Sequence, residues 1–253
     1  MRYKNVMPAV IGAAVLITAS SILAPLAAQA SRSIVPCNEA ALIKAIGKAN
    51  DDGGGTVVLS AGCTYTLTTA HDNDVMHGPV GLPIINMPVT IEGNHTTITR
   101  SRTAAPFRLA MVRPTGHLTL KAITLSGGHA AQPEHDDGGA ILNFGEATLT
   151  NSTLSGNTAD GLGGGLYSEG PAASTTITAS MIKSNVAHQG GGIASAGAEF
   201  TITGSAVDDN SAEEKPGGIY YVAGAARLGR STINANTPTN CTSSPSRVPG
   251  CMG

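Results

Sequence analysis

The sequence of 253 residues has few aromatic and few charged side chains. It contains no tryptophan, 3% of its residues are aromatic and 13% are charged, about half the charged fraction of an average globular protein. So little charge argues against a nucleic-acid-binding protein, which needs clustered Lys and Arg. It also argues against a charge-rich disordered chain or a coiled coil. Glycine is plentiful, with 32 residues, so we expect a fold in which small side chains pack closely.

The first thirty residues have the features of a secretory signal peptide. Arg2 and Lys4 give a positive start, an apolar stretch runs from Val10 to Leu23, and Ala28-Gln29-Ala30 matches the Ala-x-Ala cleavage signal. We expect residues 1–30 to be removed. The alternative is a membrane anchor that stays attached, although polar residues and a proline interrupt the apolar stretch. No later apolar stretch is long enough to span a bilayer.

The remaining residues, 31–253, are expected to form one domain that is secreted or held at the cell surface. Disulfides form in such compartments. Cys37 and Cys63 flank a helix-plus-strand unit, and Cys241 and Cys251 bracket a Ser/Pro-rich loop. Pairing by proximity predicts Cys37–Cys63 and Cys241–Cys251. No Cys-x-x-Cys or Cys/His cluster suggests zinc, and we expect no cofactor.

An internal repeat with a spacing of 25 to 29 residues is the main signal in the sequence. Each unit has an apolar–polar–apolar strand, a second apolar position, an Asn or Gly three residues later, and a strand that opens with glycines. The second apolar column is Leu125, Leu154, Ile182, Val207 and Ile233; the next column is Gly128, Asn157, Asn185, Asn210 and Asn236; the glycine-led strands begin at Gly138, Gly163, Gly190 and Gly217.

This pattern predicts an all-β fold, a right-handed parallel β-helix with about three strands per coil. One coil cannot bury its apolar face, whereas stacked coils form a continuous core. We expect the asparagines to adopt the left-handed conformation and to hydrogen-bond along the stack, and the glycines to lie at bends too tight for a Cβ. A β-sandwich is the alternative, but it would not keep one column order through every unit.

Both ends of such a solenoid need covering. Residues 38–50 have apolar side chains at helical spacing, with Asn38 as the N-cap, and are expected to form a helix that caps the N-terminal end. The 241–251 disulfide loop is expected to cover the other end. Residues 71–81 are expected to form a side loop.

These repeats carry a resemblance to a known family. From Cys37 to Cys251 the chain resembles secreted bacterial right-handed β-helix proteins of the pectate-lyase-like superfamily. The repeats are similar to those of polymorphic outer membrane proteins, which carry Gly-Gly-Ala-Ile and Phe-x-x-Asn motifs. Gly138-Gly139-Ala140-Ile141 matches the first motif, and Leu154…Asn157 matches the second with Leu in place of Phe. The resemblance implies the fold and a role at the bacterial surface.

Candidate chemistry gathers in the loops between the Asn and Gly columns, which we call the loop flank. The candidate catalytic residues are Asp136, Asp137, Asp160 and His188, and the flank also holds His129, Glu134-His135 and Glu213-Glu214-Lys215. Two acids could cleave a glycosidic bond, and oxygen ligands could hold calcium. The alternative is a solvated rim that keeps a glycine-rich surface soluble.

Other candidates lie on the strands. Lys183 and Asp208 occupy matched positions on adjacent coils and could form an acid–base or surface ion pair. An outward ladder is formed by Thr119, Thr148, Thr176 and Thr201, and Arg227 ends it. The ladder could order water or ice. The alternative is a threonine ladder of the kind that any β-helix can carry, without a binding role. Phe200 is expected in the core, and of Tyr220 and Tyr221 one should face in and one out.

No complete catalytic set is recognisable in this scaffold. We therefore expect an exported β-helix protein with a surface, adhesive or structural role. Its expected partner is polysaccharide or cell-surface material rather than nucleic acid. The alternative is a small polysaccharide lyase or glycoside hydrolase that acts through the loop flank.

Overall fold

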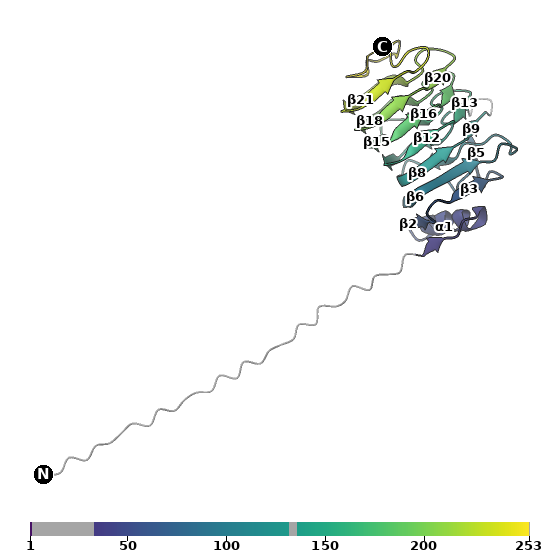
Figure 1. Cartoon of the computed structure of the whole chain (residues 1–253), viewed down its shortest axis with the longest axis vertical. Coiled ribbons are helices and arrows are strands. Elements are labelled where there is room, and N and C mark those ends of the chain that lie inside the picture. The colour runs from purple at the N-terminus through teal and green to yellow at the C-terminus, as the bar shows by residue number, and fades with distance from the viewer. Residues whose placement is uncertain (2–32, 132–135, 253) are drawn as a thin grey trace. The chain divides into compact units, whose positions relative to one another are not determined.

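The computed structural model of the chain describes Met1, residues 33–131 and residues 136–252. Over residues 33–131 and 136–252 the backbone winds into a parallel β-solenoid of stacked coils (Figure 1). The described residues contain one α-helix, and their strands pair in parallel everywhere except in one hairpin. The predicted all-β parallel β-helix is thus confirmed, whereas the predicted signal peptide, apart from Met1, lies outside the described residues.

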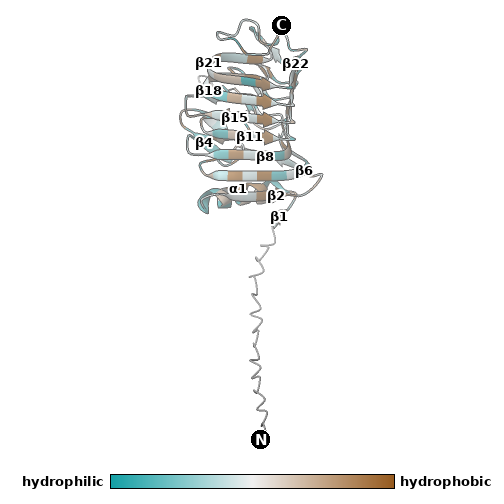
Figure 2. Ribbon diagram, turned by 90° about the vertical axis from the view of Figure 1, so that its left-hand side faces the viewer, coloured by the Kyte–Doolittle hydropathy of each residue, from teal (hydrophilic) through white to brown (hydrophobic). Residues whose placement is uncertain are grey.

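The first face of the solenoid is built from strands that lie one above another in register (Figure 2). Along each strand apolar residues alternate with polar ones, so one side is buried and the other is exposed. Leu120, Leu149 and Ile177 are buried neighbours in the inner column. The strands are β2 (Gly55–Leu59), β6 (Pro88–Arg100), β8 (His117–Ser126), β11 (Glu146–Thr150), β15 (Ser174–Thr178), β18 (Ile193–Thr203) and β21 (Ile219–Gly229), with β1 (Ile34–Val35) at the edge beside β2.

The second face follows each first-face strand after a sharp corner, so β6 and β8 contribute to both faces. Its apolar column, predicted from the sequence, is in register from Leu125 through Leu154 and Ile182 to Val207 and Ile233. All but Ile233 are fully buried. The other strands of this face are β3 (Thr64–Leu67), β12 (Thr153–Ser155), β16 (Met181–Lys183), β19 (Ala206–Asp208) and β22 (Thr232–Asn234).

Two further faces close each coil, so the prediction of about three strands per coil is wrong and a regular coil has four. The third face is a narrow sheet of two-residue strands: β9 (His129–Ala130), β13 (Thr158–Ala159), β17 (Val186–Ala187) and β20 (Ser211–Ala212). The fourth face contains β7 (Ala110–Val112), β10 (Ile141–Asn143) and β14 (Leu166–Glu169), followed by the first halves of β18 and β21. The predicted side loop at residues 71–81 contains an antiparallel hairpin, β4 (Asp72–Asp74) and β5 (Gly78–Val80).

A ladder of buried asparagines runs along the corner between the second and third faces. The side-chain amide of each rung donates to the Oδ1 atom of the next at 2.9 Å, from Asn157 to Asn185, Asn210 and Asn236. The backbone N–H of each rung donates to the same oxygen at 3.0 Å. The second amide hydrogen reaches a carbonyl of the preceding coil, as from Asn185 to Leu154 O at 3.1 Å. Each buried amide is therefore fully paired, as a buried polar group requires.

The prediction that these asparagines adopt the left-handed conformation is wrong. The residue before each asparagine does so instead: Gly156, Ser184, Asp209 and Ala235 have φ between 50° and 62°. These four corner residues are exposed. The left-handed corner turns the chain and points its own side chain into solvent, so the next side chain can point inward and join the ladder.

The predicted role of the glycines as close-approach positions is confirmed. A Cβ added at Gly191 would lie 2.1 Å from the carbonyl oxygen of Ser211, and one added at Gly164 would lie 2.3 Å from that of Val186. Backbone atoms cannot yield as a flexible side chain can. The coils can therefore stack at this corner only where the side chain is a hydrogen atom.

Helix α1 (Glu39–Asp51) covers the N-terminal end, as predicted. The Asn38 side chain accepts a hydrogen bond from Ala41 N at 2.9 Å and caps the helix. Leu42 and Ile46 are fully buried against the first coils. The predicted Cys37–Cys63 disulfide joins the helix start to β3, with 5.8 Å between the Cα atoms. Among the described residues no helix is long and apolar enough to cross a membrane.

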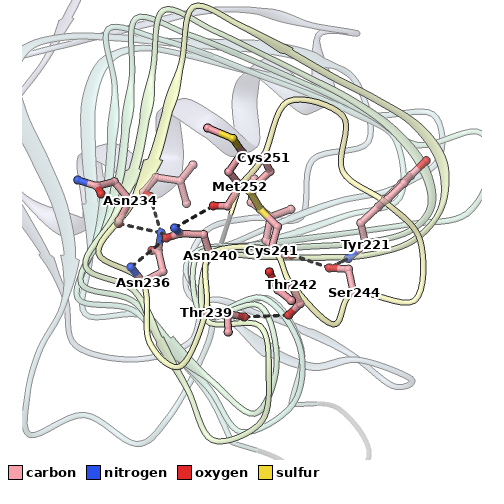
Figure 3. Close-up of a disulfide and its surroundings, with 12 residues drawn as sticks. Tyr221, Asn234, Asn236, Thr239, Asn240, Cys241, Thr242, Ser244, Cys251 and Met252 are labelled. Carbon is pink, nitrogen blue, oxygen red and sulfur yellow. Dashed lines mark hydrogen bonds between the residues drawn. A yellow bond between two sulfur atoms is a disulfide. The ribbon is translucent and has the colours of Figure 1, made fainter.

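The C-terminal loop covers the last coil through the second predicted disulfide, Cys241–Cys251 (Figure 3). Asn240 in this loop accepts from the side-chain amide of Asn236 at 2.9 Å and so ends the ladder, and its own amide donates to Met252 O at 3.1 Å. The hydroxyl of Ser244 donates to Ile219 O at 2.9 Å. The loop thus satisfies backbone and side-chain groups that another coil would otherwise pair.

The ladder should carry a large share of the stability. We predict that Asn185→Ala lowers the free energy of unfolding by about 2–4 kcal/mol, because it leaves buried partners in two coils unpaired at about 1–3 kcal/mol each. Urea unfolding measures this. Asn234→Ala, an exposed asparagine on β22, is the control and should change the stability by less than about 0.5 kcal/mol. Equal effects of the two substitutions would contradict this account of the ladder.

Candidate functional site

The loop flank consists of the loops that follow the strands of the third face. Because the coils are in register, each loop contacts its neighbour. His129 Nε2 lies 3.4 Å from Asp160 Oδ1, and His188 Nδ1 lies 3.3 Å from Glu213 Oε2. The side chains of Asp160 and Glu213 are more than half exposed, and exposed pairs of this kind contribute little to stability. Glu134 and His135 lie outside the described residues.

Asp136 and Asp137 turn onto the next coil. The Oδ1 atom of Asp137 accepts a hydrogen bond from Leu162 N at 2.6 Å, and the backbone oxygen of Asp136 accepts from Gly161 N at 3.1 Å. A Cβ added at Gly161 would lie 2.4 Å from Asp137 Oδ1 and 2.6 Å from Asp136 Oδ1, so the sum of these distances, 5.0 Å, is the largest possible separation of the two oxygens. The structure therefore brings these two predicted candidates together.

A buried arginine lies behind this carboxylate pair. Arg108 is 1% exposed, its Nε donates to Asp137 O at 3.2 Å and its Nη1 donates to His77 O. It thus holds the loop of Asp137 and the β4–β5 hairpin against the solenoid. Burial lowers the pKa of Arg108 to about 10, opposed by the charges of Asp137, Asp74 and Asp136. At neutral pH the guanidinium stays charged.

The hairpin itself is held by a second charged group. Asp74, 6% exposed, contacts His77 Nδ1 through Oδ1 at 2.7 Å and Arg113 Nη2 through Oδ2 at 2.6 Å. Burial alone would raise the pKa of Asp74. The hydrogen bonds from His77 and Met76 N, with the charges of His77 and Arg113, outweigh burial and lower it. The His77 ring also packs on Phe144, with 4.7 Å between the ring centroids.

An apolar cluster on the outer side of the fourth face supports both charged groups. Met111, Leu142 and Tyr167 are neighbours in the outward column of this face and are buried with Val80 and Ile84 from the hairpin segment. Burial, with Glu169, Asp137 and Tyr220 adding to it, raises the pKa of Tyr167. Tyr167 is therefore un-ionised at neutral pH.

The sequence pattern did not indicate that Asp74, His77, Arg108 and Arg113 form one charged group. A signal was present, because Arg108 interrupts the apolar run from Phe107 to Val112. A charged residue inside a buried strand requires partners. The sequence does not say which loop supplies them, because the partners are tens of residues away along the chain.

The chemical capacity of the carboxylate pair depends on protonation and access. Burial raises the pKa of Asp137, Asp136 and Glu169 add to this rise, and the Leu162 N–H and Arg108 oppose it. Two carboxyl groups this close, one of them with a raised pKa, are the kind of pair that acid–base chemistry uses. Two pockets of the described part of the chain lie elsewhere: one of about 560 Å³ between α1 and β1–β2, and one of about 270 Å³ within the C-terminal loop.

A metal site finds no support among the described residues. They contain no group of three or more His, Cys, Asp or Glu side chains placed to hold a metal ion. The possible calcium site of the loop flank therefore has no ligand set in this part of the chain.

Lys183 and Asp208 are paired in register, as predicted, but no ion pair joins these two described residues. The Oδ1 atom of Asp208 is buried and has no hydrogen-bond partner among the described residues. Burial raises the pKa of Asp208, and the charge of Asp209 adds to the rise.

Arg227 forms an ion pair with Glu199, with 2.7 Å between Nη1 and Oε1. Its guanidinium is therefore already paired with a carboxylate of this chain.

Comparison with known proteins returned no match to any family model, any curated protein or any solved structure.

The Asp74 contacts should make the stability depend on pH. A carboxylate whose folded pKa lies below its usual value of 3.8 stabilises the fold above that value, and this stabilisation is lost as the pH falls through the folded pKa. We predict that Asp74→Asn lowers the free energy of unfolding by about 1–3 kcal/mol at pH 7, with a smaller difference at pH 3.

Urea unfolding at both pH values measures this dependence. Asp160→Asn, which alters an exposed carboxylate, serves as the control and should have little effect at either pH. An Asp74→Asn effect that is equally large at pH 3 and pH 7 would show that the charge of Asp74 is not its source.

Proposed function

We propose that this chain is an exported, non-catalytic β-helix protein of the bacterial surface or medium, with an adhesive or structural role. The observation that carries this proposal is a contrast between two regions. In the loop flank, Asp137, Asp160 and His188 are engaged by neighbouring coils. On the outer side of the first face, the hydroxyls of the threonine ladder form no hydrogen bond with the described part of the chain. The threonine hydroxyls are therefore available to an external partner, whereas these loop-flank side chains are partly engaged within the chain.

Export is supported by two features. The leader sequence has the composition of a signal peptide. All four cysteines form disulfides, which persist in oxidising compartments. The resemblance to polymorphic outer membrane protein repeats and to the right-handed pectate-lyase-like superfamily favours a surface location. At such a location the partner of the protein would be polysaccharide or other cell-surface material.

A pull-down with product analysis tests this proposal. The purified protein is incubated with insoluble polysaccharides, bacterial wall material and host matrix, and bound protein and released sugars are both measured. We expect retention on at least one material with no soluble sugar above that of a protein-free control. Release of sugar by the protein, or no retention on any material, would overturn the proposal.

A glycoside hydrolase or polysaccharide lyase is the second candidate, favoured by Asp136 and Asp137. Their Oδ1 atoms are at most 5.0 Å apart, which is no wider than the separation of about 5–5.5 Å between the two carboxyl groups of retaining glycosidases. Asp137, with its raised pKa, would be the acid and Asp136 the nucleophile. The Leu162 N–H occupies the Oδ1 atom of Asp137, so the Oδ2 atom would carry the proton that passes to the leaving oxygen.

Single substitutions separate the two candidates. The protein is assayed on a polysaccharide panel with and without calcium, together with Asp136→Asn, Asp137→Asn and the control Asp160→Asn. We expect no sugar release from any of the four proteins. Release that is lost in Asp136→Asn and Asp137→Asn but kept in Asp160→Asn would establish the hydrolase or lyase instead.

A further inference from the structure

The outer side of the first face carries a two-dimensional array of threonines, which we call the threonine face. The structure extends the predicted ladder of Thr119, Thr148, Thr176 and Thr201 by two rungs, Thr90 and Thr56, toward the N-terminus. A second rank lies two residues further along three of the strands. The threonine face comprises Thr56, Thr90, Thr119, Thr148, Thr176 and Thr201 in the first rank and Thr150, Thr178 and Thr203 in the second.

The hydroxyls of the threonine face are available to an external partner. None of the nine forms a hydrogen bond with the described part of the chain, although each can donate one bond and accept two. A β-branched side chain has few rotamers on a strand, so neighbouring threonines present similar orientations. The array is thus ordered before any partner binds, which reduces the entropic cost of binding.

The charge of this region narrows the class of partner. The ranks themselves are neutral, and the charges beside them are paired across adjacent coils: Lys121 with Glu92 at 2.9 Å, Arg227 with Glu199 at 2.7 Å, and Glu146 with His117 at 3.1 Å. Of these side chains only Glu146 lacks a permanently charged partner, so the face offers an ionic polymer little unbalanced charge. The threonine ranks hold no aromatic side chain, so the ring platform on which sugars stack is missing. A neutral partner that forms hydrogen bonds in a regular lattice fits best.

The spacing of the rungs fits a lattice of water. Adjacent coils are about 4.8 Å apart. Water oxygens joined by a hydrogen bond are about 2.8 Å apart, and a tetrahedral angle then places second neighbours about 4.5 Å apart. Successive threonine hydroxyls can therefore replace successive second-neighbour waters along one row of ice, and the second rank begins a parallel row. The Asn ladder and the strand pairing keep this repeat constant from coil to coil.

We propose that the threonine face binds ice through hydrogen bonds to an ordered water lattice. This inference rests on the proposed function in one respect, since the face must be exported to meet ice. It goes beyond that function by naming crystalline water as the ligand of the threonine face.

Partition into growing ice tests the proposal. The purified, disulfide-bonded protein is frozen slowly in dilute solution, and the ratio of its concentration in ice to that in liquid is measured, together with inhibition of ice recrystallisation. We expect enrichment in ice over a non-binding reference protein. The double substitution Thr148→Lys/Thr176→Lys should lower the ratio at least about tenfold, which corresponds to about 1.4 kcal/mol.

Matched variants keep the test interpretable. Thr124→Lys/Thr153→Lys places the same charges on outward threonines of the second face and should leave the ratio unchanged. Thr148→Val/Thr176→Val removes only the hydroxyls and should also lower it. Far-UV circular dichroism and urea unfolding establish that each variant is folded.

Three results would overturn the inference: no enrichment of the folded native protein, equal losses in both lysine variants, or no loss in the valine variant. Its failure is distinct from failure of the proposed function. Protein that is excluded from ice yet retained on polysaccharide or wall material would contradict ice binding alone. Protein that releases sugar would contradict the proposed function, whatever its behaviour in ice.

Discussion

The fold depends on hydrogen bonds that run along the solenoid axis, perpendicular to the path of the chain. Strand pairing supplies most of them, and the buried asparagine ladder adds side-chain bonds at the corner between the second and third faces. An unpaired amide in this low-dielectric interior would be costly, whereas a fully paired row stabilises one register over all others. The glycine positions, the flat outer face and the contacts of the loop flank all require that register. A slip between two coils would disturb every column at once.

Much of this architecture follows from the sequence because each coil repeats the same requirements. The columns of Leu125 and Asn157 recur at a nearly constant spacing in the sequence. The disulfides could be predicted from the proximity of the cysteines, and the capping helix from the helical spacing of its apolar residues. The conformation of the asparagines did not follow. An asparagine tolerates the left-handed region, and a pattern of residue types does not reveal that the exposed residue before it makes the turn. That distinction depends on which side chain must point inward.

The charged group around Arg108 marks the limit of prediction from sequence. Its partners come from a hairpin and a loop that interrupt the repeat, where no column aligns one coil with another. Asp136 and Asp137 were identified as candidates, but their contacts with Gly161 and Leu162 depend on how one inserted loop lies on the next coil. The repeats could thus be predicted from local pattern, and the insertions could not, because tertiary contacts alone determine their positions.

Because the two caps are separate from the coils, the number of coils in the solenoid can change while the caps stay the same. Helix α1 and the Cys241–Cys251 loop close the two ends, and between them the coils of the asparagine ladder offer similar upper and lower surfaces to their neighbours. A duplicated coil inserted within the ladder would find its strands, amide and glycines matched by those above and below it. Evolution or protein engineering can therefore lengthen the outer face rung by rung. The strength of a surface that binds through repeated weak contacts can be adjusted by gene duplication without redesign of any single contact.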